Sequence, residues 1–303
     1  MELRLIIIGS SAAIPAHQRS LSGQVLQTPS CSYLIDCGEG TQFGLTDAKI
    51  RLNKIDHIFI SHLHGDHIFG LFGLLSSASM QGRTREMSVF APAGLKLLID
   101  AFTETQSMYL NFELNIEEID TKIYRQIFED DHFSVYSIPL KHRIPTTGYK
   151  FVEKQKSSNI HKEAVEKYQL NVDQIKSLKS GKNVCLEDGN IIHAEDVCFQ
   201  KSKPRSYAYV SDCVFHPDIV RFIRDVDVLF HEATYMNDEE ELAQSRFHST
   251  ALQAARIAKM AGAGKLILGH FSSRYSDLQP LLEEARSVFP NAWLGTDQAV
   301  FNF

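Results

Sequence analysis

Three histidines and one aspartate fall within six consecutive residues, directly after an apolar run that predicts a buried strand over 55–61. So many imidazole and carboxyl groups cannot all be satisfied inside a hydrophobic core. They are, however, the ligand types that Zn²⁺ prefers. Gly65 in their midst allows the tight backbone that would turn these side chains toward two neighbouring points. The cluster therefore predicts a two-metal site at a strand end, built from His62, His64, Asp66 and His67.

Two metal ions need more ligands than this cluster supplies, so the remaining ligands must come from elsewhere in the chain. We expect them where a histidine or aspartate directly follows another predicted strand. A lone histidine in such a place is more often a hydrogen-bonded structural residue, but several candidates beside one strong motif favour ligands. The candidates are His142 after 133–140, Asp212 after 207–211 and His270 after 266–269.

Short apolar runs alternate with helical patterns through both halves of the chain, which predicts an α/β fold. Polar residues at the strand ends of both halves favour a four-layer αββα sandwich. At 303 residues the chain can form one large domain, 1–303, or two packed halves. Strands are expected at 3–8, 23–27, 32–36, 55–61, 87–91, 133–140, 148–152, 207–210, 228–231 and 266–269, and helices at 69–78, from 93, at 249–261 and at 278–288.

A second polar set lies at 231–234 and 248–250. Glu232 can hold His248 as an imidazolium, and such a pair makes a general acid. The alternative is a structural histidine beside a helix that Ser249 or Thr250 caps. Both interpretations stay open on the residues alone.

The five cysteines are scattered and form no Cys-x-x-Cys pair, which favours reduced thiols in a cytoplasm over a disulfide framework. The apolar run at 5–8 is too short for a signal peptide and predicts a strand. No stretch approaches the ~20 apolar residues that a membrane span needs. We expect a cytoplasmic protein with no membrane partner.

Residues 154–182 are rich in lysine and polar residues, although the whole chain has a formal net charge of −6. We predict that this segment is an inserted arm outside the main core. Charge and composition alone favour a solvated, flexible surface loop over a binding arm for a polyanion.

Several longer segments are similar to one enzyme family. They are LIDCGEGTQ at 34–42, SHLHGDH at 61–67, GLFGLL at 70–75, HEAT at 231–234, HST at 248–250 and HFSSRY at 270–275. Over almost its whole length the chain resembles the ribonuclease Z family, the tRNA 3′-processing endonucleases of the metallo-β-lactamase superfamily.

The resemblance implies two zinc ions per subunit. One would be bound by His62, His64 and His142, the second by Asp66, His67 and His270, and Asp212 would bridge them. It also implies a homodimer that docks precursor tRNA, with the arm at 154–182 gripping the tRNA elbow. The resemblance thus reverses the preference that charge alone gives for a solvated loop.

The expected reaction is hydrolysis of a phosphodiester, leaving a tRNA 3′ hydroxyl and a trailer 5′ phosphate. Asp66 would orient the attacking water and take its proton, and His248, oriented by Glu232, would protonate the leaving oxygen. The residues expected to contact the substrate are Arg19, Ser272, Arg274, Lys176 and Lys179.

Two departures from the family pattern concern tRNA contacts. The arm keeps a Lys-x-Gly turn at 179–181 but lacks the usual Gly-Pro element. The loop at 15–20 ends in Ser20, where the family pattern Pro-x-x-x-Arg-Asn has asparagine. Discrimination against mature tRNA ending in CCA is therefore left open.

The nearest competing interpretation shares every predicted ligand. A small-substrate phosphodiesterase of the same superfamily would have little use for a basic insertion. A β-lactamase or thioesterase usually lacks the segment at 34–42. A non-catalytic RNA-binding protein on the same fold is disfavoured because the complete ligand set and the Glu232–His248 pair are present.

Overall fold

The computed structural model describes residues 3–107, 109–155, 158–199 and 203–303. Six strands from the first 119 residues and one from the C-terminal end form a mixed sheet. The sheet has seven strands in the order β18-β1-β2-β3-β4-β5-β6. Pairing is antiparallel from β18 to β3 and parallel from β3 to β6. The strands are β1 (Arg4–Gly9), β2 (Gly23–Gln27), β3 (Ser32–Cys37), β4 (Ile55–Phe59), β5 (Met87–Pro92), β6 (Leu114–Ile119) and β18 (Val300–Asn302).

A second sheet of seven strands has the order β17-β16-β15-β14-β9-β8-β7. Strands β14 to β17 are parallel, so their carboxyl ends meet at one edge. The strands are β7 (Arg125–Glu129), β8 (Phe133–Pro139), β9 (Thr147–Glu153), β14 (Ser206–Val210), β15 (Val228–Glu232), β16 (Lys265–Gly269) and β17 (Ala292–Leu294).

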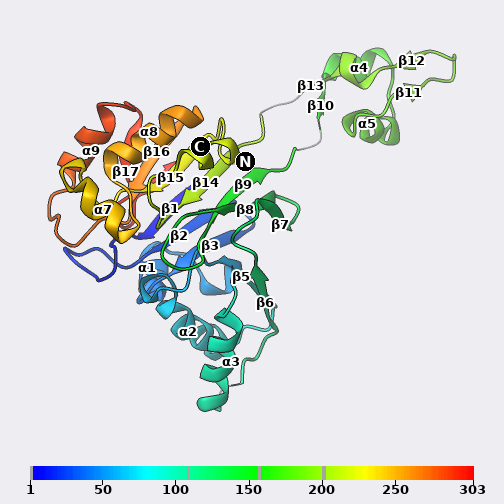
Figure 1. Ribbon diagram of the computed structural model, residues 1–303. Helices are drawn as coiled ribbons and strands as arrows, with labels where there is room; N and C mark the ends of the chain where they lie inside the picture. Colours follow the sequence, from blue (N-terminus) through cyan, green and yellow to red (C-terminus); the bar gives the residue numbers. More distant parts are fainter. Residues whose placement is uncertain (1–2, 108, 156–157, 200–202) are drawn as a thin grey trace. The chain divides into compact units, whose positions relative to one another are not determined.

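Helices cover the outer face of each sheet, as Figure 1 shows. On the first sheet, buried leucines and isoleucines of α2 and α3 pack with strand residues into one core cluster. On the second, α8 and α9 pack against β14, β15 and β16 in another cluster. The helices are α1 (Thr41–Asp47), α2 (Gly65–Met80), α3 (Leu95–Thr105), α7 (Glu240–Arg246), α8 (Ala251–Ala261) and α9 (Gln279–Arg286), with 3₁₀ turns η1 (Leu52–Lys54), η2 (Pro217–Phe222) and η3 (Asn237–Glu239).

Aromatic side chains fill the space between the two sheets. Phe59 on β4 stacks on Phe90 with ring centroids 4.9 Å apart. The same ring meets Phe151 and Tyr149 of β9 edge-on at 5.1 and 5.3 Å. Two sheets packed face to face and covered by helices on both outer faces confirm the predicted αββα sandwich.

Residues 130–134 and 152–205 form a compact unit of their own. Its apolar side chains, among them Leu170, Leu178, Val184 and Ile192, make a separate small core. The predicted arm at 154–182 lies in this unit, and the helices within it were not expected from the sequence. The elements are β10 (Asn159–Ile160), α4 (Lys162–Lys167), α5 (Val172–Lys179), β11 (Val184–Cys185), β12 (Ile191–Ile192), α6 (Ala194–Val197) and β13 (Cys198–Phe199).

Among the described residues, none of the helices has the length and hydropathy required to cross a bilayer.

Candidate active site

The histidine-rich motif lies where β4 gives way to α2. His62 comes three residues after the strand, and His64 is the N-cap of the helix. Asp66 and His67 lie in the first helical turn, where the helix dipole favours a carboxylate. The backbone of Gly65 is not left-handed, so the tight turn expected of it is not what requires a glycine here. A Cβ there would come 2.3 Å from the Phe69 ring, but that side chain is 61% exposed and free to turn away.

The first group of side chains that could hold a metal ion comes from both sheets. His62, His64, His142 and Asp212 each offer a ligand atom, and these atoms lie within 4.8 Å of one another. Nε2 of His62 lies 2.9 Å from Nδ1 of His64, and Nε2 of His142 lies 3.3 Å from the same atom. His142 follows β8, and Asp212 follows β14.

A second group consists of Asp66, His67 and His270. Nε2 of His67 and Nε2 of His270 lie 3.3 Å apart. Oδ2 of Asp66 lies 3.6 and 3.5 Å from these two nitrogens, and it accepts a hydrogen bond from the backbone N–H of Ala13 at 2.8 Å. The Ala13 amide therefore fixes the orientation of this carboxylate.

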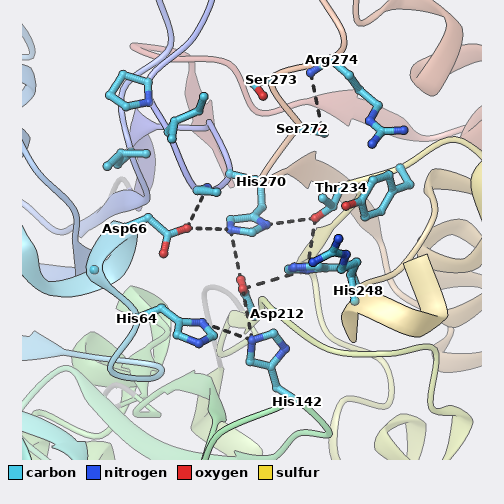
Figure 2. Close-up of a pocket in the computed structure, with 18 of the residues that line it drawn as sticks. His64, Asp66, His142, Asp212, Thr234, His248, His270, Ser272, Ser273 and Arg274 are labelled. Atoms are coloured by element: carbon cyan, nitrogen blue, oxygen red, sulfur yellow. Dashed lines mark hydrogen bonds and ion pairs between the residues drawn. The ribbon is translucent and has the colours of Figure 1, made fainter. Parts of the chain in front are cut away.

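Asp212 lies between the two groups, as Figure 2 shows. Its Oδ2 lies 3.5 Å from Nε2 of His62 and 3.7 Å from Nε2 of His142. Its Oδ1 lies 3.3 Å from Nε2 of His67 and 3.2 Å from Nε2 of His270. One carboxylate thus presents one oxygen to each group, which is the geometry a bridging ligand requires.

In three of these histidines, the ring nitrogen that faces away from the site donates a hydrogen bond to a neighbouring residue. Nδ1 of His67 donates to Asp36 at 2.7 Å, and Nδ1 of His142 donates to the Phe247 carbonyl at 3.0 Å. Nδ1 of His270 donates to the Thr234 hydroxyl at 3.0 Å. In each case the Nε2 lone pair points into the site. Converging lone pairs repel one another unless a cation lies between them, so the donor set fits divalent metal ions.

The electrostatics of the site agree with this fit. Burial and the nearby His67 hold the pKa of His62 well below its usual range, so its ring is neutral as a ligand must be. Burial opposes the charge of Asp212, but the His270, His67 and His62 rings hold its pKa well below the usual range. Burial also disfavours a charged His67, yet Asp212 and Asp66 raise its pKa well above the usual range. These two carboxylates therefore favour positive charge at the His67 ring, as they would favour a cation beside it.

Asp212 and His270 have left-handed backbones, with φ values of 46° and 57°, although neither is glycine. Asp36, which lies behind His67, shares this conformation with a φ of 56°. Such residues cost on the order of 1–3 kcal/mol each and persist where the surrounding structure imposes them. Each lies at a strand end and turns the chain sharply there.

Glu232, which is fully buried, pairs with the mostly buried His248 beside the two groups of potential metal ligands. Nδ1 of His248 lies 3.0 Å from Oε1 of Glu232. The Thr234 hydroxyl donates to Oε2 of Glu232 at 2.5 Å. Burial disfavours the imidazolium, but Glu232 more than offsets this and raises the pKa of His248 to about 9. His248 also lies close enough to Asp212 and His270 to form a third possible metal-binding group with them.

One part of the predicted alternative for 248–250, the helix cap, is present in the structure. Thr250 is the N-cap of α8 and forms a capping box with Gln253. Ser249 instead donates to the Cys213 carbonyl at 2.7 Å. The segment therefore both caps the helix and presents His248 to the site.

A cleft of about 690 Å³ opens over these residues. Arg143 and Arg246, which the sequence did not single out, line it and are exposed. Guanidinium groups on the rim suit a phosphate-bearing substrate. The cleft is lined by Ile14, His64, Asp66, Phe69, His142, Arg143, Asp212, Thr234, Tyr235, Arg246, His248, His270, Ser272 and Arg274, among others.

The predicted substrate-binding residues have different positions. Ser272 and Arg274 line the cleft, and the Arg274 guanidinium lies 2.6 Å from Glu239. Arg19 is only 7% exposed and donates to the carbonyls of Ser272 and Tyr275. The structure therefore gives Arg19 a role in holding the 272–275 loop, while its substrate contact stays a prediction.

Lys176 and Lys179 lie on α5, in the separate unit, and do not line the cleft. Their expected substrate contacts stay predictions.

Sequence reasoning missed the residues behind the donors. Asp36 and Thr234 lie in the segments at 34–42 and 231–234, but nothing in those segments indicated which histidine each would hold. Tyr209 also contacts Asp36, and no motif marked it.

Two family models match parts of the chain. Residues 3–99 match a model described as anti-Pycsar protein Apyc1, and residues 197–271 match the beta-lactamase superfamily domain.

Curated relatives match nearly the whole chain. A protein of Bacteroides fragilis named ribonuclease Z is 39% identical over 98% of this chain and 97% of its own length. A ribonuclease Z of Geobacillus kaustophilus is 40% identical over 99% of both. Among solved structures, the short form of human tRNase Z superposes with a TM-score of 0.71 at 26% identity and 98% coverage of each chain.

Proposed function

This chain belongs to the ribonuclease Z family, and we infer that it is an endoribonuclease that removes the 3′ trailer from precursor tRNA. Similarity to ribonuclease Z relatives over nearly the full length is the observation that carries this conclusion. The cleft, with histidine and aspartate donors at its floor and arginines at its rim, supports it independently.

The centre requires divalent metal, and we propose two zinc ions per subunit. His62, His64 and His142 would hold one ion, Asp66, His67 and His270 the other, and Asp212 both. Neutral imidazole and carboxylate donors suit zinc. Two ions in such a site stabilise charge on the attacking and leaving oxygens of a phosphodiester.

Asp66 is proposed to orient the attacking water and to accept its proton. Burial disfavours the charge of Asp66, but the His67 and His270 rings hold its pKa well below the usual range, and the Ala13 amide fixes its orientation. Attack on phosphorus breaks its bond to the 3′ oxygen of the tRNA. The phosphate then stays on the 5′ end of the trailer.

His248 is proposed to supply the proton that the leaving 3′ oxygen needs. Its Nδ1 is held by Glu232, so Nε2 is the atom that can donate to the oxygen in the cleft. Glu232 stabilises the imidazolium before transfer, and the Thr234 hydroxyl holds Glu232 in place.

The separate unit is proposed to bind the tRNA body. An Asn171 capping box starts helix α5, and the backbone N–H groups of Gly181 and Lys182 close its end. Lys176 and Lys179 lie in the last turn of this helix, and the exposed ammonium of Lys176 lies 3.9 Å from Asp173, a loose pair that a phosphate would replace. The prediction that 154–182 is a flexible tRNA-binding insertion remains a proposal.

We further propose a homodimer that works in the cytoplasm. The five cysteines are free thiols, which suits a reducing compartment. Sedimentation of the purified protein would test the dimer, and cell fractionation the location.

The decisive experiment incubates the protein with a 3′-extended precursor tRNA, with and without a chelator, and maps the cut to one nucleotide. We expect one cut that leaves a 3′ hydroxyl on the tRNA and that the chelator abolishes. No cleavage by metal-loaded protein would overturn the proposed function.

A further inference from the structure

Three buried tyrosines of the second sheet donate hydrogen bonds from their hydroxyl groups to residues in the first half of the chain. Tyr149 on β9 donates to the Ile60 carbonyl at 2.5 Å. Tyr207 and Tyr209 point to the same face of β14, because they are two residues apart on this strand. Their partners are Oε1 of Gln24 at 2.5 Å and Oδ2 of Asp36 at 2.6 Å. All three tyrosines are at most 1% exposed.

Of these three hydrogen bonds, that of Tyr209 has an acceptor, Asp36, that also contacts a proposed metal ligand. The acceptor, Oδ2 of Asp36, also accepts from the Ser61 hydroxyl at 2.8 Å and from Nδ1 of His67 at 2.7 Å. The other oxygen of Asp36 accepts from the Ser61 backbone N–H at 2.7 Å. The carboxylate is fully buried, so these donors replace its hydration and fix its orientation.

We propose that Tyr209 is a positioning residue for the metal centre: it fixes Asp36, which keeps the proton of His67 on Nδ1 and turns Nε2 toward His270. The inference rests on the proposed two-ion centre. A carboxylate behind a ligating histidine sets both its tautomer and its orientation. Asp36 does this from β3, but one of the three donors to its Oδ2 comes from the opposite sheet.

Strand β14 thereby acts on the second group of donors in two ways. Asp212, which follows the strand, faces His67 and His270 directly. Tyr209, within the strand, acts on His67 through Asp36. A displacement of β14 would therefore disturb both the bridging carboxylate and a histidine of the first sheet.

The test compares Tyr209→Phe with Tyr207→Phe, because both variants remove one buried hydroxyl from the same face of the same strand. Stepwise zinc affinity of the metal-free protein is measured by competition with a chromophoric chelator. Tyr209→Phe should weaken one of the two binding steps by about tenfold. Tyr207→Phe should leave both steps unchanged, although it loses a comparable hydrogen bond.

A second readout does not depend on metal. In ¹⁵N-labelled protein, the Nδ1–H resonance of His67 should shift or broaden in Tyr209→Phe and stay in place in Tyr207→Phe. If the wild type binds no zinc, the proposed centre is wrong, and this resonance alone decides the role of Tyr209.

Two outcomes would overturn the inference. One is a folded Tyr209→Phe protein with wild-type zinc affinity and an unmoved His67 resonance. The other is an equal loss of affinity in both tyrosine variants, which would assign the effect to general packing between the sheets. Should Tyr209→Phe not fold, Asp36→Asn tests the next link, and wild-type affinity for both ions there would contradict the proposal.

Discussion

Oε1 of Glu232 lies 3.0 Å from Nδ1 of His248, and both side chains are largely buried beside the donors of the proposed metal centre. A buried carboxylate against an imidazole favours a protonated ring, as a general acid requires. The same histidine lies near Asp212 and His270, so it could also act as a ligand. The two roles predict different outcomes on mutation.

His248→Ala should slow precursor tRNA cleavage by about 10²–10⁴-fold, the usual contribution of a general acid. Metal content, measured by plasma mass spectrometry, should stay near two ions per chain. His216→Ala is the matched control, because that ring pairs with Asp218 outside the cleft. Loss of metal in His248→Ala would instead make His248 a ligand.

Asp212→Asn should reduce metal content from two ions to one or none. The carboxylate faces both donor groups, and an amide can neither balance the charge of two cations nor bind both equally well. Asp218→Asn, at an exposed acid, should keep both ions. Two tightly held ions in Asp212→Asn would show that the bridge is unnecessary.

Replacement of 155–203 by a short Gly-Ser linker should cripple cleavage of precursor tRNA and spare hydrolysis of bis(p-nitrophenyl) phosphate. The design keeps Glu153 and Arg205, whose side chains pair at 2.8 Å at the base of this unit. The reason is that contacts between lysines and phosphates dominate the affinity for RNA, and this affinity decreases as the salt concentration rises. Equal loss of both activities would contradict a substrate-binding role for the unit.

Lys176→Ala combined with Lys179→Ala should raise KM for precursor tRNA and flatten its salt dependence, with kcat less affected. Both lysines lie in the last turn of α5. Lys96→Ala, whose ammonium pairs with Asp100 on α3, is the control and should behave as wild type. An unchanged salt dependence in the double variant would remove these lysines from the RNA contact.

Cys37 should resist alkylation in the native protein, whereas Cys185 should react readily. Cys37 is fully buried, and burial raises the pKa of its thiol to about 12. Cys185 is exposed. Mass-spectrometric mapping after brief iodoacetamide treatment would check this. Rapid labelling of Cys37 under native conditions would show that the core around β3 opens.

Strand ends were the most predictable part of this structure. The runs before Asp212 and His270 are short and almost wholly buried, and the run before His62 is buried from Ile58 onward. Parallel strands of this kind give a clear sequence signal. The predicted start of a helix was wrong where a capping residue determined it. The helix expected from 249 begins at Ala251, because Thr250 caps it.

The residues that hold the predicted ligands in place could not be predicted from the sequence. Asp36 meets Tyr209 across a gap of 173 positions, and no local pattern encodes a contact between two sheets. The helices at 162–167 and 172–179 were missed because their few apolar residues close only a small separate core. Their polar composition resembles that of a loop.

The division of the donors between the two sheets has a consequence for the order of events during synthesis. The motif at 62–67 leaves the ribosome early, with four of its donors side by side, yet His142, Asp212 and His270 follow much later. The second donor group is complete only when residue 270 of 303 has emerged. In the proposed two-ion centre, the second ion would therefore have to wait until nearly the whole chain is made, and a chain truncated before β16 would lack one of its ligands.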